Sequence, residues 1–320
     1  MPEIQGGTIY AVGSINADLV AYGNPAEAGT NYTVGHDFNF NLGGKSLNVA
    51  MTLNALKAQT KLVSRVGSDF LGTEIIRRLE EHQIDSSNIK IDPQAHTGIG
   101  HVRISDDGEY DTMVIPGASL NVGIEDFRQS LEDDSDGMVV LNFEISKASV
   151  FEIANEARSR GIKVAINFSP IFNWGSEMIA LADLAVLNYS EANAIVENRE
   201  HLDLEGVTRK IQSAGAKSVV ITLGKNGVCG CDSDGRYFLI PTNPTEVVNA
   251  VGAGDTFLAA LIRGLSSGLP LEKSAEIANE AGRLACLQAE SFLQPNNADS
   301  ILKLLNQLIE VSSESEKVYE

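Results

Sequence analysis

The sequence predicts an α/β fold: a mostly parallel β-sheet with helices on both faces, and a small β-sheet that stands off the main one. The first observation is that apolar runs of strand length alternate with stretches of helical periodicity along most of the 320 residues. The second is that this alternation breaks at 18–42 and 98–115, where extended segments follow one another. We therefore expect one domain over 1–320, with these two segments forming a lid.

The predicted elements follow from the spacing of apolar residues. Buried strands are expected at 8–15, 60–67, 137–145, 162–169, 181–190 and 216–224. Helices are expected at 45–58, 70–82, 147–161 and 203–215. Within 98–115 the pair Asp107-Gly108 predicts a hairpin turn, 18–42 reads as two extended segments around a Pro/Gly loop, and 227–241 reads as a second hairpin.

Composition and charge exclude several classes of function. The net charge is −19, which argues against a nucleic-acid partner because such a partner requires a positive surface. No apolar run is long enough to span a membrane. The N-terminus has no basic segment followed by an apolar one, and the cysteine count is odd, with Cys229, Cys231 and Cys286. We therefore expect reduced thiols and a cytoplasmic location.

The stretch Gly252-Ala253-Gly254-Asp255 precedes an amphipathic helical pattern. Glycines let the chain turn tightly and aim backbone N–H groups at one point, and a helix N-terminus adds free donors and a positive dipole end. Such a site binds phosphate or an oxyanion. Asp255 beside it could accept the proton of a hydroxyl that receives a phosphoryl group. Taken alone, Asp255 as a helix N-cap after a glycine turn is the simpler interpretation.

A second glycine pair, Gly43-Gly44, also precedes a helical pattern, in which Lys45 and Asn48 offer donors on the first turn. Gly44-Lys45-Ser46 resembles the end of a phosphate-binding P-loop, but Asn39 stands where that motif needs its first glycine. A P-loop nucleoside triphosphatase is therefore excluded. A dinucleotide-binding oxidoreductase is excluded too, because the first strand is not followed by Gly-x-Gly-x-x-Gly.

Polar residues follow several of the predicted strands, at the end where ligands bind in α/β sheets. Asn16 and Asp18 are expected to close the first strand, on one face because they are two residues apart. Each of these positions is ordinary turn chemistry by itself, and only their coincidence favours a site. The others, grouped by strand, are Glu144, Asn188 with Glu191, and Thr222 with Gly224.

With these motifs in order, the chain resembles the ribokinase-like sugar kinases (the PfkB family) from about residue 8 to about residue 295. "GGKSLNVAMTLNALKAQTKLVSRVGSDFLG" is similar to the family's N-terminal signature, and "NAVGAGDTF" is similar to its C-terminal one. Within the family the motifs look most like those of the ribokinases. The resemblance implies ATP-dependent phosphorylation of a primary sugar hydroxyl, with D-ribose as the first expected substrate.

The resemblance also implies roles for individual residues. Asp255 would be the catalytic base, and Gly252, Ala253 and Gly254 the anion hole. The sugar would be bound by Asn16, Asp18, Gly43, Gly44, Lys45, Asn48 and Glu144. ATP would be bound by Asn188, Thr222, Gly224, Gly227 and Asn279. Glu191 would hold Mg²⁺ through water. The lid would cover the sugar and join two subunits in a homodimer.

Departures from the family pattern bear on the ion and on the sugar. Asn249 stands where the family has an aspartate that ligates an activating monovalent cation, and Glu290 lies where small residues are expected in the second cation loop. We therefore expect only weak activation by K⁺. Ser46-Leu47 replaces a smaller pair, which leaves a nucleoside, fructose or a keto-deoxy sugar acid as alternative substrates. A non-catalytic sugar-binding relative is the remaining alternative.

Overall fold

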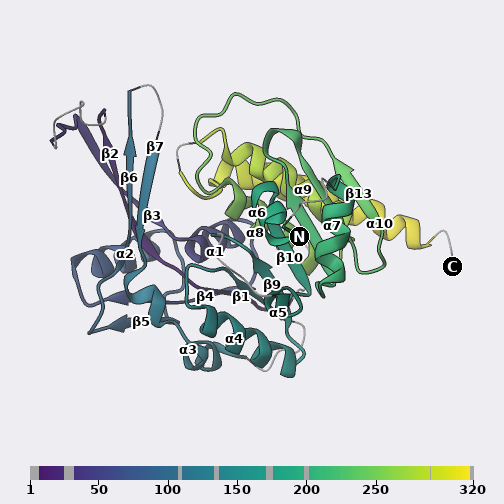
Figure 1. Ribbon diagram of the computed structural model, residues 1–320, viewed down its shortest axis with the longest axis horizontal. Helices are drawn as coiled ribbons and strands as arrows, with labels where there is room; N and C mark the ends of the chain where they lie inside the picture. The colour runs from purple at the N-terminus through teal and green to yellow at the C-terminus, as the bar shows by residue number, and fades with distance from the viewer. Residues whose placement is uncertain are drawn as a thin grey trace.

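The fold is the one that the sequence predicts, a large mostly parallel sheet covered by helices and a separate small sheet (Figure 1). The computed structural model describes residues 7–24, 32–106, 110–132, 137–170, 176–197, 202–288 and 290–317. Within these residues no helix is long and apolar enough to cross a bilayer.

The large sheet has nine strands in the order β13-β12-β11-β10-β9-β8-β1-β4-β5. The seven strands from β11 to β5 are parallel, and the hairpin β12-β13 adds two antiparallel strands at one edge. The strands are β1 (Ile9–Val12), β4 (Thr60–Gly67), β5 (Ile89–Asp92), β8 (Met138–Leu141), β9 (Lys163–Asn167), β10 (Leu184–Asn188), β11 (Ser218–Thr222), β12 (Val228–Cys231) and β13 (Tyr237–Ile240).

Two hydrophobic cores lie on the two faces of this sheet, because successive strand residues point to opposite sides. Ile9 and Ala11 belong to one core, and Tyr10 and Val12 to the other. The first core is covered by α1 (Lys45–Ala55), α2 (Phe70–Glu81), α8 (Ala253–Ser266), α9 (Leu271–Ala285) and α10 (Pro295–Lys317). The second is covered by α3 (Ile124–Ser130), α4 (Lys147–Ser159), α5 (Ser176–Ile179), α6 (Tyr189–Ile195) and α7 (Leu204–Ser213).

The small sheet has four strands in the order β3-β2-β6-β7 and rises from the large sheet beside α2 (Figure 1). Its strands are β2 (Asn16–Tyr22), β3 (Asp37–Gly43), β6 (Gly98–Ile104) and β7 (Tyr110–Ile115). The predicted hairpin at 98–115 is confirmed by the antiparallel pairing of β6 with β7. Its turn residues, Asp107-Gly108, and the Pro/Gly loop at 25–31 lie outside the described residues.

Two expectations about strand ends were wrong. The first strand ends at Val12, so Asn16 and Asp18 do not close it but open β2 of the small sheet. The chain turns out of the large sheet at Gly13, where a Cβ would lie 2.3 Å from the Ser46 hydroxyl. Strand β8 likewise ends at Leu141, three residues before Glu144. Glu144 therefore lies in the connection that follows β8, and Asn16 and Asp18 lie on the small sheet. None of the three belongs to a strand of the large sheet.

Candidate active site

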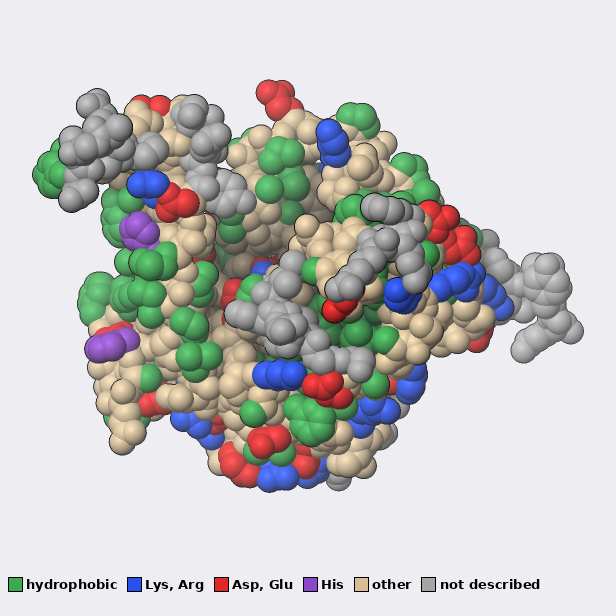
Figure 2. Space-filling view, in the orientation of Figure 1, with side chains coloured by type: hydrophobic (Ala, Val, Ile, Leu, Met, Phe, Trp, Pro, Cys, Tyr) green, Lys and Arg blue, Asp and Glu red, His purple; other side chains and the backbone are tan. Residues whose placement is uncertain are grey.

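Asp18, Lys45, Asn48, Glu144 and Asp255 come together at a hollow beside the small sheet. Acidic and basic side chains lie at the floor of this hollow (Figure 2). The connections that follow β1 and β8 reach the N-terminus of α1 through Ser14 and Glu144, and the first turns of α1 and α8 meet through Asn48 and Asp255. Helix N-termini carry free N–H donors and a positive dipole end, so this edge of the sheet favours a negatively charged ligand.

Asp255 lies in the first turn of α8, with its side chain buried at 5% exposure. The helix N-cap is Gly252, in the left-handed region at φ 78°, so Asp255 is not the cap. Only glycine fits at this position, because a Cβ would lie 1.8 Å from the Ser291 carbonyl oxygen. The first N–H with an intrahelical acceptor is that of Thr256, which donates to Gly252 at 2.8 Å. The N–H groups of Gly254 and Asp255 come before it in the chain and point toward the N-terminal end of α8.

Two residues of α1 face the Asp255 carboxylate. Asn48 Nδ2 donates to Asp255 Oδ2 at 2.9 Å, and Lys45 Nζ lies 4.0 Å from Asp255 Oδ1. Burial raises the pKa of Asp255, and the charges of Glu144 and Glu191 raise it further, whereas Lys45 and Asn48 oppose the rise. The same carboxylate raises the pKa of Lys45. The raised pKa makes the carboxylate a stronger base than a solvent-exposed aspartate, and its neighbours on α1 favour the charged form.

Glu144 is fixed at the N-terminus of α1. One carboxylate oxygen, Oε2, accepts from the Lys45 backbone N–H at 3.1 Å and from the Ser14 hydroxyl. The Glu144 N–H in turn donates to Asn142 Oδ1 at 2.9 Å. Because a single oxygen takes both bonds, the other oxygen is left to face the hollow.

Asn16 and Asp18 project from the root of the small sheet, among glycines. A Cβ on Gly43 would lie 2.1 Å from Asp18 Oδ2, and a Cβ on Gly100 would lie 2.3 Å from Asp18 Oδ1. Gly98 makes the same room for Asn16, at 2.3 Å from its Oδ1. The neighbouring strands carry no side chains at these glycines. The Asn16 and Asp18 side chains can therefore lie directly against the backbones of those strands. Close approach of this kind is what glycine in a strand interior permits.

This end of the site is rich in unused acceptors. The side-chain oxygens Asn16 Oδ1 and Asn48 Oδ1 are buried and have no hydrogen-bond donor. Burial, together with the charges of Glu144 and Asp255, raises the pKa of Asp18 to about 7. Buried acceptors without donors are rare and costly in proteins. These acceptors, from Asn16, Asn48 and Asp18, suit a ligand that has several hydroxyl donors and no negative charge.

The residues expected to contact a nucleotide lie at the ends of the next strands. Asn188 and Glu191 form a reciprocal capping box at α6, with Asn188 N–H donating to Glu191 Oε2 at 2.7 Å and Glu191 N–H donating to Asn188 Oδ1 at 2.9 Å. Gly224 and Gly227 flank a short 3₁₀ turn with φ of 57° and 97°. Thr222 ends β11, and its hydroxyl donates to Leu187 O at 3.4 Å.

Asn279 comes from α9, on the other side of this region, and its amide donates to the Pro241 carbonyl at 2.9 Å. The structure therefore does not bring its donor to the strand ends, and the side chain contributes its remaining oxygen at most.

The carboxylate groups of the site are not arranged as a preformed metal-binding site. Among the described residues no three His, Cys, Asp or Glu side chains come together as metal ligands. Glu191 is 4% exposed and contributes charge to the Lys45–Asp255 pair. One carboxylate with a capping role fits Mg²⁺ that keeps most of its water, which is the usual state of Mg²⁺ beside phosphates.

Several supporting residues were missed by the sequence reasoning. Ser14 holds Glu144, and Asn142 Nδ2 donates to Ser46 Oγ at 2.7 Å beneath the glycine turn. Ser46 therefore points toward Asn142, so its size does not by itself narrow the sugar site. Gly98 and Gly100 could have been noticed, because glycines at period two in a strand signal a close approach.

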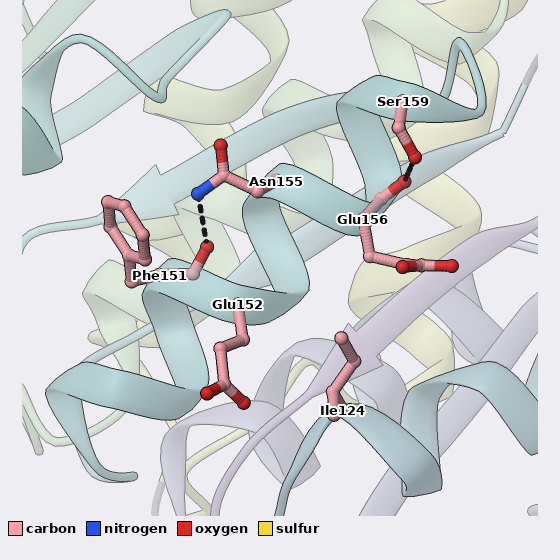
Figure 3. Close-up of a pocket in the computed structure, with 6 residues that line it drawn as sticks. All are labelled: Ile124, Phe151, Glu152, Asn155, Glu156 and Ser159. Carbon is pink, nitrogen blue, oxygen red and sulfur yellow. Dashed lines mark hydrogen bonds between the residues drawn. The ribbon is translucent and has the colours of Figure 1, made fainter.

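A second hollow lies between α4 and the start of α3 (Figure 3). It is a shallow groove of about 430 Å³ lined by Ile124, Phe151, Glu152, Asn155, Glu156 and Ser159. Its polar groups are engaged locally: the Asn155 amide donates to Phe151 O at 2.8 Å and the Ser159 hydroxyl donates to Glu156 O at 2.7 Å. The polar side chains of the groove do not converge on one point. The groove differs in this respect from the candidate active site, where polar groups from several elements meet.

Comparison with known proteins identifies the family. The model of the pfkB family of carbohydrate kinases matches residues 8–295. The chain belongs to this family. It is a sugar kinase, that is, a phosphotransferase with an alcohol group as acceptor.

Individual pfkB relatives agree with this assignment. The chain is 29% identical to the ribokinase of Lactococcus lactis over 281 residues, covering 87% of this chain and 90% of the relative. It is 28% identical to the ribokinase of Bacillus subtilis over 278 residues, covering 87% and 92%. The Arabidopsis thaliana ribokinase complexed with ribose and ATP has the same fold, with a TM-score of 0.81 at 21% identity over 93% of this chain and 99% of that one.

Proposed function

We infer that this kinase transfers the γ-phosphoryl group of ATP to the primary hydroxyl of D-ribose, with residues 1–320 acting as one kinase domain. The observation that supports it most is the buried Asp255 carboxylate at the N-terminus of α8, hydrogen-bonded to Asn48 and facing Lys45. The similarity to ribokinases over most of the chain supports ribose as the acceptor. Asp255 accepts the hydroxyl proton as the oxygen attacks the phosphorus atom.

The negative charge of the transferring group meets two kinds of donor. The backbone N–H groups of Gly254 and Asp255 lie at the positive end of α8, and Gly252 and Ala253 shape the turn that presents them. Lys45 adds a positive charge beside the base. Glu191 would hold Mg²⁺ through water, and the bound ion would supply charge neutralisation for the phosphates.

The acceptor set favours a neutral polyol over a sugar acid. Asp18, Glu144, Asp255 and Glu191 act electrostatically on one another or on Lys45, so four carboxylates share the site with one ammonium group. A ligand carboxylate would be repelled here, whereas sugar hydroxyls can donate to Asp18, Glu144 and the free Asn16 oxygen. The keto-deoxy sugar acid is therefore the least favoured alternative.

On the nucleotide side, Asn188, Thr222, Gly224 and Gly227 form the wall of the ATP site, with Asn279 at its margin. The small sheet closes over the sugar because Asn16 and Asp18 are carried on it while Asp255 belongs to the large part of the molecule. Ordering the sheet over the ligand also excludes water from the reacting groups.

An ADP-release assay across sugars tests this function. Ribose, deoxyribose, fructose, a nucleoside and a keto-deoxy sugar acid are compared with ATP and Mg²⁺ present. Ribose is expected to have the highest kcat/KM. A higher value for fructose or a nucleoside would replace ribose as the substrate, and activity with none of them would leave only the assignment to the family.

A further inference from the structure

Helices α1 and α8 run side by side in the same direction, and both begin at the site. The Asn48–Asp255 hydrogen bond joins their first turns. Eight residues further along each helix, about 12 Å away at the α-helical rise, a second polar contact joins them. Arg263 Nε on α8 donates to the backbone carbonyl of Leu56, the C-cap of α1, at 2.9 Å.

The second contact is entirely buried. Arg263 is 4% exposed and Leu56 is 0% exposed. Carbonyl groups in the last turn of a helix have no intrahelical donor, and here the guanidinium supplies one. Arg263 Nη1 also donates to Ser267 Oγ at 3.2 Å, which fixes the orientation of the planar group.

A buried arginine at this position lowers the stability of the folded protein relative to an apolar side chain. Within the described part of the chain no carboxylate pairs with Arg263, and burial lowers its pKa. A buried charge without a counter-ion lowers stability, and an apolar side chain of similar volume would pack without that penalty. Between the two contacts α8 presents Ala259, which is fully buried and allows close packing. The cost points to a requirement beyond filling the core.

We propose that Arg263 is a positioning residue for phosphoryl transfer, which holds the C-terminal end of α1 on α8 so that Lys45 and Asn48 stay in register with Asp255. Two contacts about 12 Å apart along parallel helices fix both their sliding and their rotation. Helix α1 is also held by hydrogen bonds at Lys45, Ser46 and Thr52, but all of these lie before its C-terminal end. Without the Leu56 contact that end can tilt away from α8, and the tilt moves the Lys45 ammonium relative to the base. Displacements of about 1 Å can cost up to 100-fold in rate.

The proposal rests on Asp255 as the base, and Arg263→Met tests it. This variant keeps the apolar stem and removes the donors. We expect kcat to fall about 10-fold, with the KM values for sugar and ATP changing less than about 3-fold. We also expect the acidic limb of the kcat profile to move to higher pH, because Lys45 and Asn48 then oppose the effects of burial and of the Glu144 and Glu191 charges less effectively at Asp255.

Three further variants make the outcome decisive. Arg263→Lys keeps the charge and one donor and should recover most of the lost rate. If the methionine variant does not fold, the lysine variant alone decides, with an expected loss of about 3-fold. Val150→Ala, in the core on the opposite face of the sheet, controls for lost stability and should leave kcat and its pH profile unchanged.

A wild-type kcat and pH profile in the folded Arg263 variant, with only a lower Tm, would overturn the proposal. Equal losses in Val150→Ala would do so too. Asp255→Asn is assayed alongside: near-normal turnover there would reject the proposed base itself. An inactive Asp255→Asn with a normal Arg263→Met would reject only the positioning role.

Discussion

At the scale of single residues, the Asp255 carboxylate combines burial, which raises its pKa, with two donors that favour its charged form. Burial of this kind lowers the stability of the charged form, and the arrangement of Asn48 and Lys45 opposes that effect. Perturbed pKa values in charged clusters of this kind gather at functional sites.

Replacing Asp255 with Asn tests this role. The amide keeps the size and can still accept from Asn48, but it cannot take a proton. We expect kcat to fall by roughly 10²–10⁴, the usual contribution of a general base, while calorimetry shows sugar affinity within about 3-fold of wild type. Turnover close to that of the wild type would show that another group accepts the proton.

The ionisation of Asp18 makes the stability of the folded protein depend on pH. Its pKa in the folded protein is raised to about 7 from 3.8. The folded protein therefore holds a proton there that the unfolded chain has lost, and its stability falls as pH rises from about 4 to about 7. Asp18→Asn removes this effect, so its stability relative to wild type should increase by about 1–2 kcal/mol between about pH 5.5 and about pH 8.

Denaturant unfolding of the unliganded proteins at the two pH values measures the effect. Asp37→Asn, an exposed position on the neighbouring strand β3, is the matched control and should show no such change. The same Asp18 variant should bind the sugar more weakly, by about 1–3 kcal/mol. A stability difference that does not vary with pH would contradict the link.

At the scale of elements, two loops meet behind the anion-binding turn. Val248 N–H and Asn249 N–H donate to the Cys286 carbonyl at 2.8 and 3.3 Å, and the segment at Ser291 presses on Gly252. Leu293 N–H donates to Thr52 Oγ1 at 3.3 Å, which ties the second loop to α1. The turn that carries Gly252 is therefore held between α1 and the loop after α9.

These loops are where K⁺ would act, and their side chains offer it little charge. Asn249 Oδ1 accepts from the Val251 N–H at 3.0 Å, and Glu290 is exposed. We expect weak dependence of activity on K⁺, compared at fixed ionic strength with a large organic cation. Asn249→Asp adds a negative hard-oxygen ligand and should increase the response. Strong, saturable activation of the wild type would contradict this and would direct attention to Glu290.

At the scale of the whole molecule, the small sheet has two edge strands, β3 and β7, and exposed apolar side chains on the face opposite Asp18. Phe38 and Met113 are each 57% exposed on that face, where they alternate with the residues that point toward the site. Open edges and exposed apolar side chains in one sheet are usually covered by another chain. We propose a homodimer in which two small sheets pack together.

Light scattering tests the dimer. Phe38→Glu should convert it to a monomer, because a carboxylate would be buried at the interface without a partner. Phe151→Glu is the control: this phenylalanine is 45% exposed in the α4 groove of Figure 3 and lies away from the small sheet. A wild-type mass equal to one subunit at all working concentrations would rule out the dimer.

The sequence by itself determined the fold class and many of the elements. Apolar periodicity predicted β4 at its full length and the helices α1, α2, α4 and α7 to within a few residues, because buried faces impose that periodicity. The glycine turns before α1 and α8 were readable too, since only glycine permits such backbone and such close approach. Asp255, Lys45 and Asn48 were predicted from these turns.

Only the tertiary structure decided which element carries each polar group and what holds it. Asn16 and Asp18 lie on the small sheet rather than on the first strand, because the chain leaves the large sheet at Gly13. Ser14, Gly98 and Gly100 became informative only when strands distant in sequence were paired. The Arg263–Leu56 contact spans 207 residues, and no local pattern records it. Periodicity reports burial, whereas partners depend on how buried faces meet.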